Sequence, residues 1–227
     1  MKSSIPRGSG RPREKLVHKL DPNNPRFDII EKAADFILEG NILAIPTDTV
    51  YGLACDSTNP AAVKKLYELK GRSYDKPLPV LIDGLRTLNR LVKKIPPDVK
   101  TMLDNLWPGA LTVIFPKPAT MLSSVSSGPS LGVRIPDNTI MLSVISMTAR
   151  PLAVTSANPS GEAPATGSEK VRHYFGTKIK MILDGGESSS EGVSTVISTL
   201  SRPYAILRQG LISAEELKKY LKDIEIR

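Results

Sequence analysis

Apolar residues near the start of the chain follow first the spacing of a helix and then that of short buried strands. In residues 27–39 the apolar positions fall on one helical face: Ile29, Ile30, Ala33, Phe36 and Ile37. Gly40 follows as a stop signal, and residues 42–46 form a short apolar run typical of a buried strand. Asn59 and Pro60 have the residue types of a helix cap and first turn, so the pattern predicts helix, strand and helix in succession.

The same two patterns continue to the end of the chain. Further strands are predicted at residues 78–82, 111–115, 131–135, 152–155, 179–183, 194–198 and 204–208. Further helices are predicted at residues 85–93, 97–106, 139–148 and 168–175, and from Ser213, where Ser-Ala-Glu-Glu matches a capping box. Because strands and helices interleave, we expect an α/β fold with an open, twisted, mixed sheet and flanking helices.

The N-terminal segment lacks any apolar period. Residues 1–24 combine basic side chains with Ser, Pro and Gly, which predicts a basic, disordered tail, and we expect one domain over residues 25–227. An organelle-targeting segment is the alternative interpretation of this tail. The sequence has no apolar run of roughly 18 residues, so no membrane span is predicted.

The charge balance changes this picture little. The chain has 31 Lys and Arg against 23 Asp and Glu, a net charge of +8, which suggests nucleic-acid binding. The first twenty residues hold six basic side chains and one acidic one, so the remainder is only mildly basic, at +3. The single cysteine, Cys55, excludes an intrachain disulfide and fits a reducing compartment, and we expect a cytoplasmic protein.

Several common catalytic motifs are absent from the sequence. It contains no GxxxxGK[ST], GxGxxG, HExxH, CxxC or GxSxG. The two histidines, His18 and His173, fall in the tail and in a polar helix, which argues against a Ser-His-Asp hydrolase. Cys55 is interpreted as a small packed residue.

Polar groups instead gather where the predicted strands begin or end, which is where open α/β sheets bind ligands. The segment 46–53 follows the first strand and holds two threonines, an aspartate and a tyrosine. The segment 155–161 offers hydroxyls and an amide in a tight turn, and the segment 192–197 places a hydroxyl pair at a strand start. Each segment taken alone could be an ordinary turn.

Five cations belong to the same strand ends: Lys70, Arg72, Lys76, Arg134 and Arg208. Arg134 lies inside the otherwise apolar run 131–135, and a buried charge is costly unless it pairs with an anion. Arg and Lys donors suit a phosphate chain, although a solvated helix end explains residues 70–76 equally well. Together the five cations predict a sheet edge ringed by positive charge, which suits a polyanion such as ATP.

At these residues the sequence resembles the YrdC/Sua5 family. The family's motifs stand in order between residues 26 and 215: PTDTVYGL at 46–53, KGR with a following lysine and proline at 70–77, WPG-LT at 107–112, VRIP at 133–136, SAN-SG at 156–161, STV at 194–196 and LR-G at 207–210. Seven motifs in the right order are much more specific than any one of them.

The resemblance implies an enzyme, a nucleotidyltransferase that joins ATP, L-threonine and bicarbonate into threonylcarbamoyl-AMP and releases pyrophosphate. It implies a twisted α/β sheet with a concave, basic cavity, and Mg²⁺ carried by ATP rather than by protein ligands. It also implies a downstream transferase complex that passes the threonylcarbamoyl group to adenosine 37 of tRNA, with at most a weak direct contact to tRNA. Longer members carry a second C-terminal domain, and a chain of 227 residues leads us to expect the form with one YrdC-like domain.

The resemblance also implies roles for single residues. Thr49, Arg134 and Ser194 match the positions that contact threonine, with Arg134 pairing with its carboxylate. The positions that match ATP-binding residues are Arg72, Lys76, Ser130, Ser156, Asn158 and Arg208. Lys70 and Arg72 match the catalytic cations, which act electrostatically and without a covalent nucleophile.

Two residues depart from the family pattern, and three other functions stay open. Lys76 stands where many members have asparagine, and Leu81 where some have a histidine near threonine. The alternatives are an RNA-binding module that uses the concave surface, a catalytically altered paralogue, and a carbamoyl-adenylate activity like that of the related domain in hydrogenase-maturation proteins. The modest charge of the body argues against the first, the full set of polar residues against the second, and Thr49 with Arg134 against the third.

Overall fold

The computed structural model describes residues 16–188 and 192–227. Within these residues its helices are α1 (Phe27–Leu38), α2 (Pro60–Lys70), α3 (Leu85–Leu91), α4 (Pro97–Leu106), α5 (Thr139–Thr148), α6 (Ser168–Phe175) and α7 (Ala214–Lys218), with one 3-10 turn at Gly176–Lys178. Its strands are β1 (Val17–Lys19), β2 (Leu43–Ile45), β3 (Gly52–Asp56), β4 (Val80–Leu81), β5 (Leu111–Pro116), β6 (Ser130–Arg134), β7 (Leu152–Ser156), β8 (Ile182–Asp184), β9 (Thr195–Ser198), β10 (Tyr204–Arg208) and β11 (Ile224–Ile226).

The described strands form one sheet of 11 strands in the order β1-β8-β2-β3-β7-β4-β6-β5-β9-β10-β11. The sheet is mixed: β4 runs parallel to β6 and β5 to β9, whereas β3 and β7 are antiparallel.

Two predicted helix starts are confirmed at the atomic level. The Asn59 side chain accepts the backbone N–H groups of Ala61 and Ala62, and Ser213 accepts that of Glu216. The prediction of an open, mixed α/β sheet with flanking helices is confirmed.

Three strands were not predicted, and one of them corrects the domain boundary. β1 pairs in parallel with β8, placing Val17 opposite Ile182, and Leu20 beyond it is buried. Assigning residues 16–24 to a disordered tail was therefore wrong, because three strand residues are too few to leave a periodic pattern. Residues 1–15 lie outside the described part of the chain.

The missed strands β3 and β11 have similar explanations. β3 has the sequence GLACD, without a β-branched residue, yet all five of its positions are buried. It contains Cys55, which is packed as predicted, and burial raises the pKa of its thiol to about 12. β11 is again only three residues long and pairs with β10 at the edge of the sheet.

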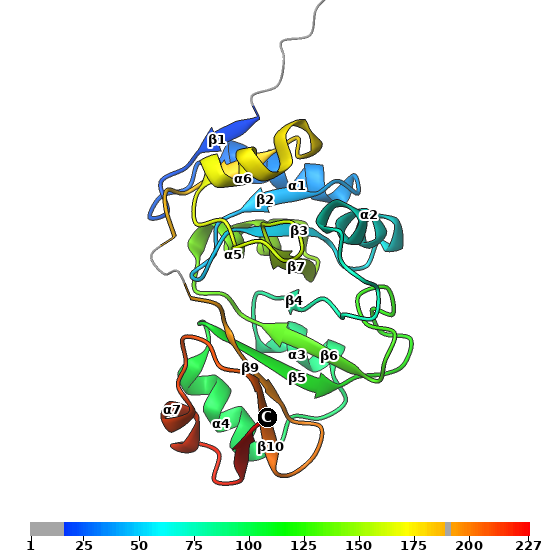
Figure 1. Ribbon diagram of the computed structural model, residues 1–227, viewed down its shortest axis with the longest axis vertical. Helices are drawn as coiled ribbons and strands as arrows, with labels where there is room; N and C mark the ends of the chain where they lie inside the picture. Colours follow the sequence, from blue (N-terminus) through cyan, green and yellow to red (C-terminus); the bar gives the residue numbers. More distant parts are fainter. Residues whose placement is uncertain (1–15, 189–191) are drawn as a thin grey trace, which may run out of the picture.

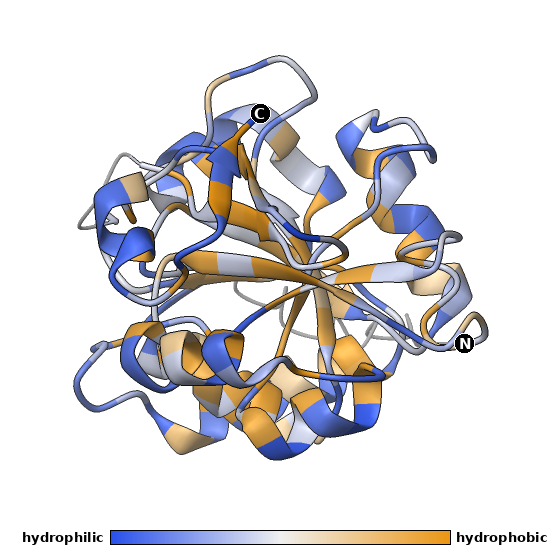
Figure 2. Cartoon of the chain, turned by 90° about the horizontal axis from the view of Figure 1, so that it is seen from below, coloured by the Kyte–Doolittle hydropathy of each residue, from blue (hydrophilic) through white to orange (hydrophobic). Residues whose placement is uncertain are grey.

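Strands β1, β8, β2, β3 and β7 make up the two-sided region, the upper half of Figure 1. Neighbouring residues of one strand pack into different cores: Leu43 and Ile45 of β2 meet α1 and α5, whereas Ala44 packs in the core that contains α2 and α6. This alternation follows from the two-residue period of a strand. Figure 2 shows helices on both sides of the strands, with hydrophobic colour concentrated in the interior.

Strands β6, β5, β9, β10 and β11 make up the one-sided region, the lower half of Figure 1. Leu111, Val113 and Phe115 of β5 pack in one core with residues of α3, α4 and α7. The alternate positions of these strands, among them Thr112 and Gly132, lie on the other face. The two-residue strand β4 joins the two regions by pairing with β7 on one side and β6 on the other.

Candidate active site

A cavity of about 160 Å³ lies where the two regions meet. Its walls come from the β2–β3 loop, the end of β7, the segment before β4, and the uncovered face of the one-sided region. Six of the residues predicted for the site line it: Thr49, Arg72, Arg134, Ser156, Ser194 and Arg208. The fold thus brings together positions that are up to 159 residues apart, the separation of Thr49 and Arg208.

The turn that carries Thr49 is held rigidly by its own hydroxyl groups. The Thr47 hydroxyl donates to the Val50 carbonyl at 2.7 Å and accepts the Thr49 N–H at 3.1 Å. The two threonine hydroxyls lie 2.9 Å apart. Because both side chains are buried, these bonds fix the Thr49 hydroxyl in the cavity wall before any ligand arrives.

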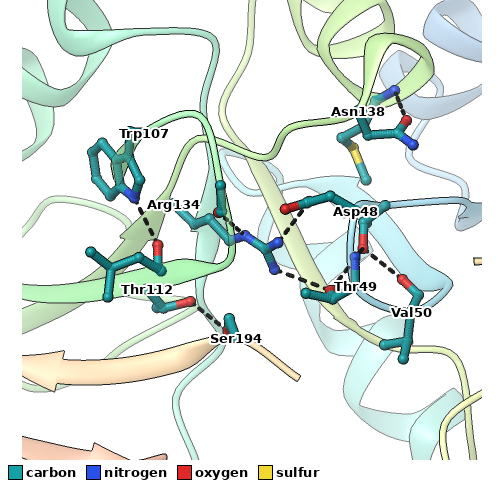
Figure 3. Close-up of polar contacts among 12 residues, drawn as sticks. Asp48, Thr49, Val50, Trp107, Thr112, Arg134, Asn138 and Ser194 are labelled. Atoms are coloured by element: carbon teal, nitrogen blue, oxygen red, sulfur yellow. Dashed lines mark hydrogen bonds and ion pairs between the residues drawn. The ribbon is translucent and has the colours of Figure 1, made fainter. Parts of the chain in front are cut away.

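Arg134 reaches from the end of β6 across the junction to this turn, as Figure 3 shows. Its Nη1 donates to Thr49 Oγ1 at 3.2 Å and its Nε to the Gly109 carbonyl at 2.8 Å. Its Nη2 lies 2.6 Å from Asp48 Oδ1, an ion pair in which neither atom has hydrogen-bond geometry toward a partner. The side chains of Arg134 and Asp48 are only 7% and 13% exposed, so the carboxylate is what makes the buried charge tolerable.

Asp48 supports the candidate site through its ion pair with Arg134, and the sequence-based assignment left it out. The expectation that Arg134 needs an anion was correct, but its anion within the protein is Asp48 rather than a ligand alone. The signal was present in the PTDT motif, whose aspartate directly precedes Thr49. Sequence alone could not pair Asp48, in the β2–β3 loop, with Arg134 at the end of β6, a strand far away in the sequence.

Lys70 does not line the cavity but lies behind its wall. Its Nζ donates to the carbonyl and hydroxyl oxygens of Ser156, at 2.7 and 3.2 Å, and to the carbonyl and side-chain oxygens of Asn158, at 2.9 and 3.0 Å. The Asn158 amide in turn donates to the carbonyls of Pro159 and Glu162. Lys70 and Asn158 therefore shape the turn that presents Ser156, rather than pointing free donors into the cavity.

Burial lowers the pKa of Lys70 to about 8, and the neighbouring positive charge of Arg72 acts in the same direction. The four oxygen acceptors oppose this effect, because they stabilise the ammonium form. Lys70 is thus a cation close to its titration range at mildly alkaline pH.

Two further guanidinium groups are tethered at the cavity wall. Arg72 donates through Nε and Nη2 to the carbonyls of Lys76 and Pro77, each at 3.0 Å. Arg208 donates through Nε and Nη2 to the Ser194 carbonyl, at 3.0 and 2.8 Å, and through Nη2 to the Ser194 hydroxyl at 2.9 Å. Burial lowers the pKa of both groups, and Arg134 and Arg72 lower that of Arg208 further. Such clustered, partly desolvated cations attract an anion strongly.

The remaining predicted residues, Lys76 and Ser130, lie outside the cavity wall. The structure shows their carbonyl groups in use, Lys76 accepting from Arg72 and Tyr67, and Ser130 from the Ser126 hydroxyl. Sequence reasoning identified the segments that contain these two residues but could not show which atoms face the cavity.

Thr112 and Tyr51 line the cavity without having been assigned to the site, and Gly210 packs beside its Ser194. The Thr112 and Ser194 hydroxyls lie 2.9 Å apart, and the Tyr51 hydroxyl donates to the Gly186 carbonyl at 2.6 Å. A Cβ at Gly210 would stand 2.3 Å from the Val193 carbonyl oxygen, so only glycine lets the chain pass this close to Ser194.

Among the helices of the described residues, none is both long and apolar enough to cross a membrane.

The model of the Sua5/YciO/YrdC family, which is described as telomere recombination, matches residues 35–210. The threonylcarbamoyl-AMP synthase of Pyrococcus abyssi is 38% identical over 198 residues, 87% of this chain and 58% of that protein. The threonylcarbamoyl-AMP synthase of Bacillus subtilis is 37% identical, over 93% of this chain and 61% of that protein. The chain thus spans about three-fifths of the length of these relatives.

The fold is also that of a solved structure. The crystal structure of P. abyssi Sua5 complexed with L-threonine matches with a TM-score of 0.90 and 35% identity, over 94% of this chain and 63% of that chain. The family match covers most of the sequence and includes the segments that form the cavity. The chain belongs to the Sua5/YciO/YrdC family.

Proposed function

We propose that this protein is a threonylcarbamoyl-AMP synthase, which converts ATP, L-threonine and bicarbonate into threonylcarbamoyl-AMP and pyrophosphate. The observation that carries the proposal is one cavity lined by two sets of side chains. The first set is Arg134 with the hydroxyls of Thr49 and Ser194. The second set is Arg72 and Arg208 with the Ser156 turn. The first set suits an amino acid and the second a phosphate chain. The relatives' activity and the threonine complex of P. abyssi Sua5 support the same assignment.

On the amino-acid side, we assign Arg134, which lines the cavity, to the threonine carboxylate. Asp48 and the Gly109 carbonyl hold the guanidinium in place. The hydroxyls of Thr49 and Ser194 bind the remaining polar groups of the amino acid. Leu81 lines the same cavity as an apolar contact for the substrate methyl group.

On the nucleotide side, Arg72, Arg208 and Ser156 bind the phosphates, and Lys70 with Asn158 keeps the serine turn in shape. A cavity of about 160 Å³ is smaller than the roughly 300–1,000 Å³ usual for larger ligands, so the nucleoside extends beyond it. Lys76 and Ser130 lie outside the wall, and we assign them to this outer part of the nucleotide.

The chemistry needs positioning and charge neutralisation rather than a nucleophilic side chain. The threonine amine adds to CO₂ derived from bicarbonate and loses a proton, which gives a carbamate. A carbamate oxygen attacks the α-phosphorus of ATP, and the bond to the β-phosphate oxygen breaks to release pyrophosphate. Arg72 and Arg208 offset the charge that grows on the phosphates. Lys70 contributes through the Ser156 turn, so we assign it a positioning role rather than a direct contact.

The described wall of the cavity offers guanidinium and hydroxyl groups but no carboxylate. Across the described residues, no three His, Cys, Asp or Glu side chains cluster as metal ligands. This donor set fits Mg²⁺ that is bound by the triphosphate and water and enters with ATP. We further propose a cytoplasmic protein whose product passes to a transferase complex that modifies tRNA.

The proposal is tested by incubating the purified protein with ATP, Mg²⁺, bicarbonate and L-threonine, and leaving out each in turn. We expect pyrophosphate release that requires both threonine and bicarbonate, with a product of threonylcarbamoyl-AMP mass. Arg72→Ala should lower this rate by about 10²-fold or more while the protein stays folded. Arg172→Ala, at an exposed position of α6, is the matched control and should keep full activity.

If ATP stays intact under every condition, the synthase assignment is wrong. A catalytically altered member of the family, or an RNA-binding module, would then be the better description. Normal turnover in folded Arg72→Ala would overturn the assignment of the phosphate side alone.

A further inference from the structure

The proposed function gives no role to the segment 107–110, which joins α4 to β5 and begins the WPG-LT motif. Pro108 in this loop is exposed, whereas Trp107 is only 8% exposed. The Trp107 indole donates through Nε1 to the Leu111 carbonyl at 2.8 Å, and its backbone N–H donates to the Leu103 carbonyl at 3.0 Å. Trp107 thus anchors the 107–110 loop to the end of α4 and to the start of β5.

Gly109 connects this loop to the end of β6 by two hydrogen bonds. Its carbonyl accepts the Nε–H of Arg134 at 2.8 Å, and its N–H donates to the carbonyl of Ile135 at 2.9 Å. Figure 3 shows Trp107 on one side of the Arg134 guanidinium and Asp48 on the other. The guanidinium is therefore held from two sides, by a carboxylate and by a backbone carbonyl.

The next residues of the chain support a second group on the amino-acid side of the cavity. The Ala110 carbonyl accepts the N–H of Thr195, which directly follows Ser194, at 3.0 Å. The Thr112 hydroxyl lies 2.9 Å from the Ser194 hydroxyl. One short stretch of chain therefore holds both Arg134 and Ser194, which come from separate parts of the sequence.

The loop follows this path because position 109 has no side chain. A Cβ at Gly109 would stand 2.6 Å from the Leu106 carbonyl oxygen, a distance that real Cβ atoms essentially never show. This oxygen belongs to the backbone at the last residue of α4, so it cannot rotate away as a flexible side chain could. The φ of Gly109 lies outside the left-handed region, so the close approach alone requires glycine. Any other residue would displace the loop.

We propose that Gly109 is a positioning residue for the threonine carboxylate and acts through Arg134. The guanidinium is a planar fork, so a tether at Nε fixes the direction in which the other N–H groups point. A displaced loop would leave Arg134 charged but without this tether. The inference rests on the proposed function, because it takes the threonine carboxylate as the ligand of Arg134.

The test compares Gly109→Ala with Gly84→Ala by isothermal titration calorimetry with L-threonine, in the absence of ATP. Gly84 is the matched control, because a Cβ there meets nothing within 4 Å and its extended backbone accepts any residue. It also lies outside the cavity wall. We expect Gly109→Ala to bind threonine about tenfold more weakly, through the lost hydrogen bond to a charged group, and Gly84→Ala to bind like the wild type.

Two further measurements separate positioning from a merely structural role. In Gly109→Ala the KM for threonine should rise about tenfold while the KM for ATP stays near the wild-type value. The reason is that, among the described residues, no hydrogen bond joins Gly109 to Arg72 or Arg208. L-Threoninamide, which lacks the carboxylate charge, should bind to Gly109→Ala and to the wild type alike.

Equal threonine binding by folded Gly109→Ala and the wild type would overturn the inference and leave the synthase assignment intact. An equal loss of affinity for threonine and threoninamide would also overturn it, because Gly109 would then have a general structural role. If the wild type neither binds threonine nor releases pyrophosphate in its presence, the inference and the proposed function both fail.

If Gly109→Ala does not fold, Trp107→Phe takes its place. This substitution keeps an aromatic ring but removes the indole N–H that anchors the loop to Leu111. Threonine binding should weaken about threefold, with threoninamide binding unchanged. Threonine affinity equal to that of the wild type would again overturn the inference.

Discussion

The two-sided and the one-sided region bury their strands in different ways. In β2, β3 and β7 almost every position is buried, because helices cover both faces of the sheet. In β9, and at the ends of β5 and β6, buried and partly exposed positions alternate, because the core lies on one face. Sheets covered on both faces favour continuous apolar runs, whereas one covered face favours alternation.

This difference explains where the polar groups of the site stand. Thr112 and Arg134 occupy positions of β5 and β6 that alternate with core residues, so they are presented without opening the core. The two-sided region has no such free face, and it contributes through a loop and a strand end, at Thr49 and Ser156. The site therefore exists only where the two regions join, beside the short strand β4.

The largest expected effect comes from breaking the ion pair that crosses this junction. Arg134→Met leaves the Asp48 carboxylate buried without its cation, which should cost about 3–5 kcal/mol of stability in urea unfolding. It should also raise the KM for threonine about tenfold or more, through the lost charged hydrogen bond. The double variant Asp48→Asn with Arg134→Met should recover much of the stability but not the KM. An unchanged unfolding midpoint in Arg134→Met would show that the pair does not join the regions.

A matched pair of isoleucine substitutions, one in each region, compares the two regions directly. Ile45 of β2 is fully buried in the two-sided region, whereas Ile114 of β5 is partly exposed on the uncovered face of the one-sided region. Ile45→Ala should destabilise the protein by about 3 kcal/mol and Ile114→Ala by about 1 kcal/mol, measured by urea unfolding. Equal losses would mean that both faces of the one-sided region are covered in solution.

The pH dependence should reveal the positioning role of Lys70. Because its pKa is lowered to about 8, the ammonium that holds the Ser156 turn is lost as the pH rises through that value. Activity should fall about tenfold one pH unit above it, when about nine-tenths of the lysine is neutral. Lys70→Arg, which keeps its charge, should lower activity but remove the pH dependence in this range. If the pH–activity profile of Lys70→Arg is identical to that of the wild type, a group other than Lys70 causes the loss of activity.

The lowered pKa of Lys70 also determines whether its contribution to stability rises or falls with pH. The folded-state pKa lies below the ordinary lysine value of 10.5, so between about 8 and 10.5 the unfolded chain binds more protons. The contribution of Lys70 to stability should therefore rise with pH in this window, in the direction opposite to activity. Unfolding of the wild type and Lys70→Met across this range checks the sign.

The smallest effect is expected at the end of α5 in the two-sided region. Ala149 has φ +49°, in the left-handed region that favours glycine, and caps the helix there. Ala149→Gly relieves the strain of this conformation, partly offset by the greater freedom of the unfolded chain. The net stabilisation should be about 0.5 kcal/mol in urea unfolding, with no change in activity. A loss of stability would show that the left-handed conformation is not maintained in solution.

Much of the fold and most of the site could be predicted from the sequence. All seven helices within residues 16–188 and 192–227 were expected from apolar periodicity and cap residues, and six predicted residues line one cavity. The short strands β1, β3 and β11 were missed. β1 and β11 have only three residues each, and β3, with the sequence GLACD, has neither a β-branched residue nor a regular apolar–polar alternation. Their existence depends on neighbouring strands that offer hydrogen bonds.

The sequence by itself determined the class of fold, the family motifs and the residue types that suit an amino acid and a phosphate chain. Only the tertiary structure decided which of these residues meet. It paired Arg134 with Asp48, placed Lys70 behind the wall rather than in it, and left Lys76 and Ser130 outside. The reason is physical: periodicity and capping act within a few residues, whereas a buried charge is neutralised by whichever group the sheet order brings beside it.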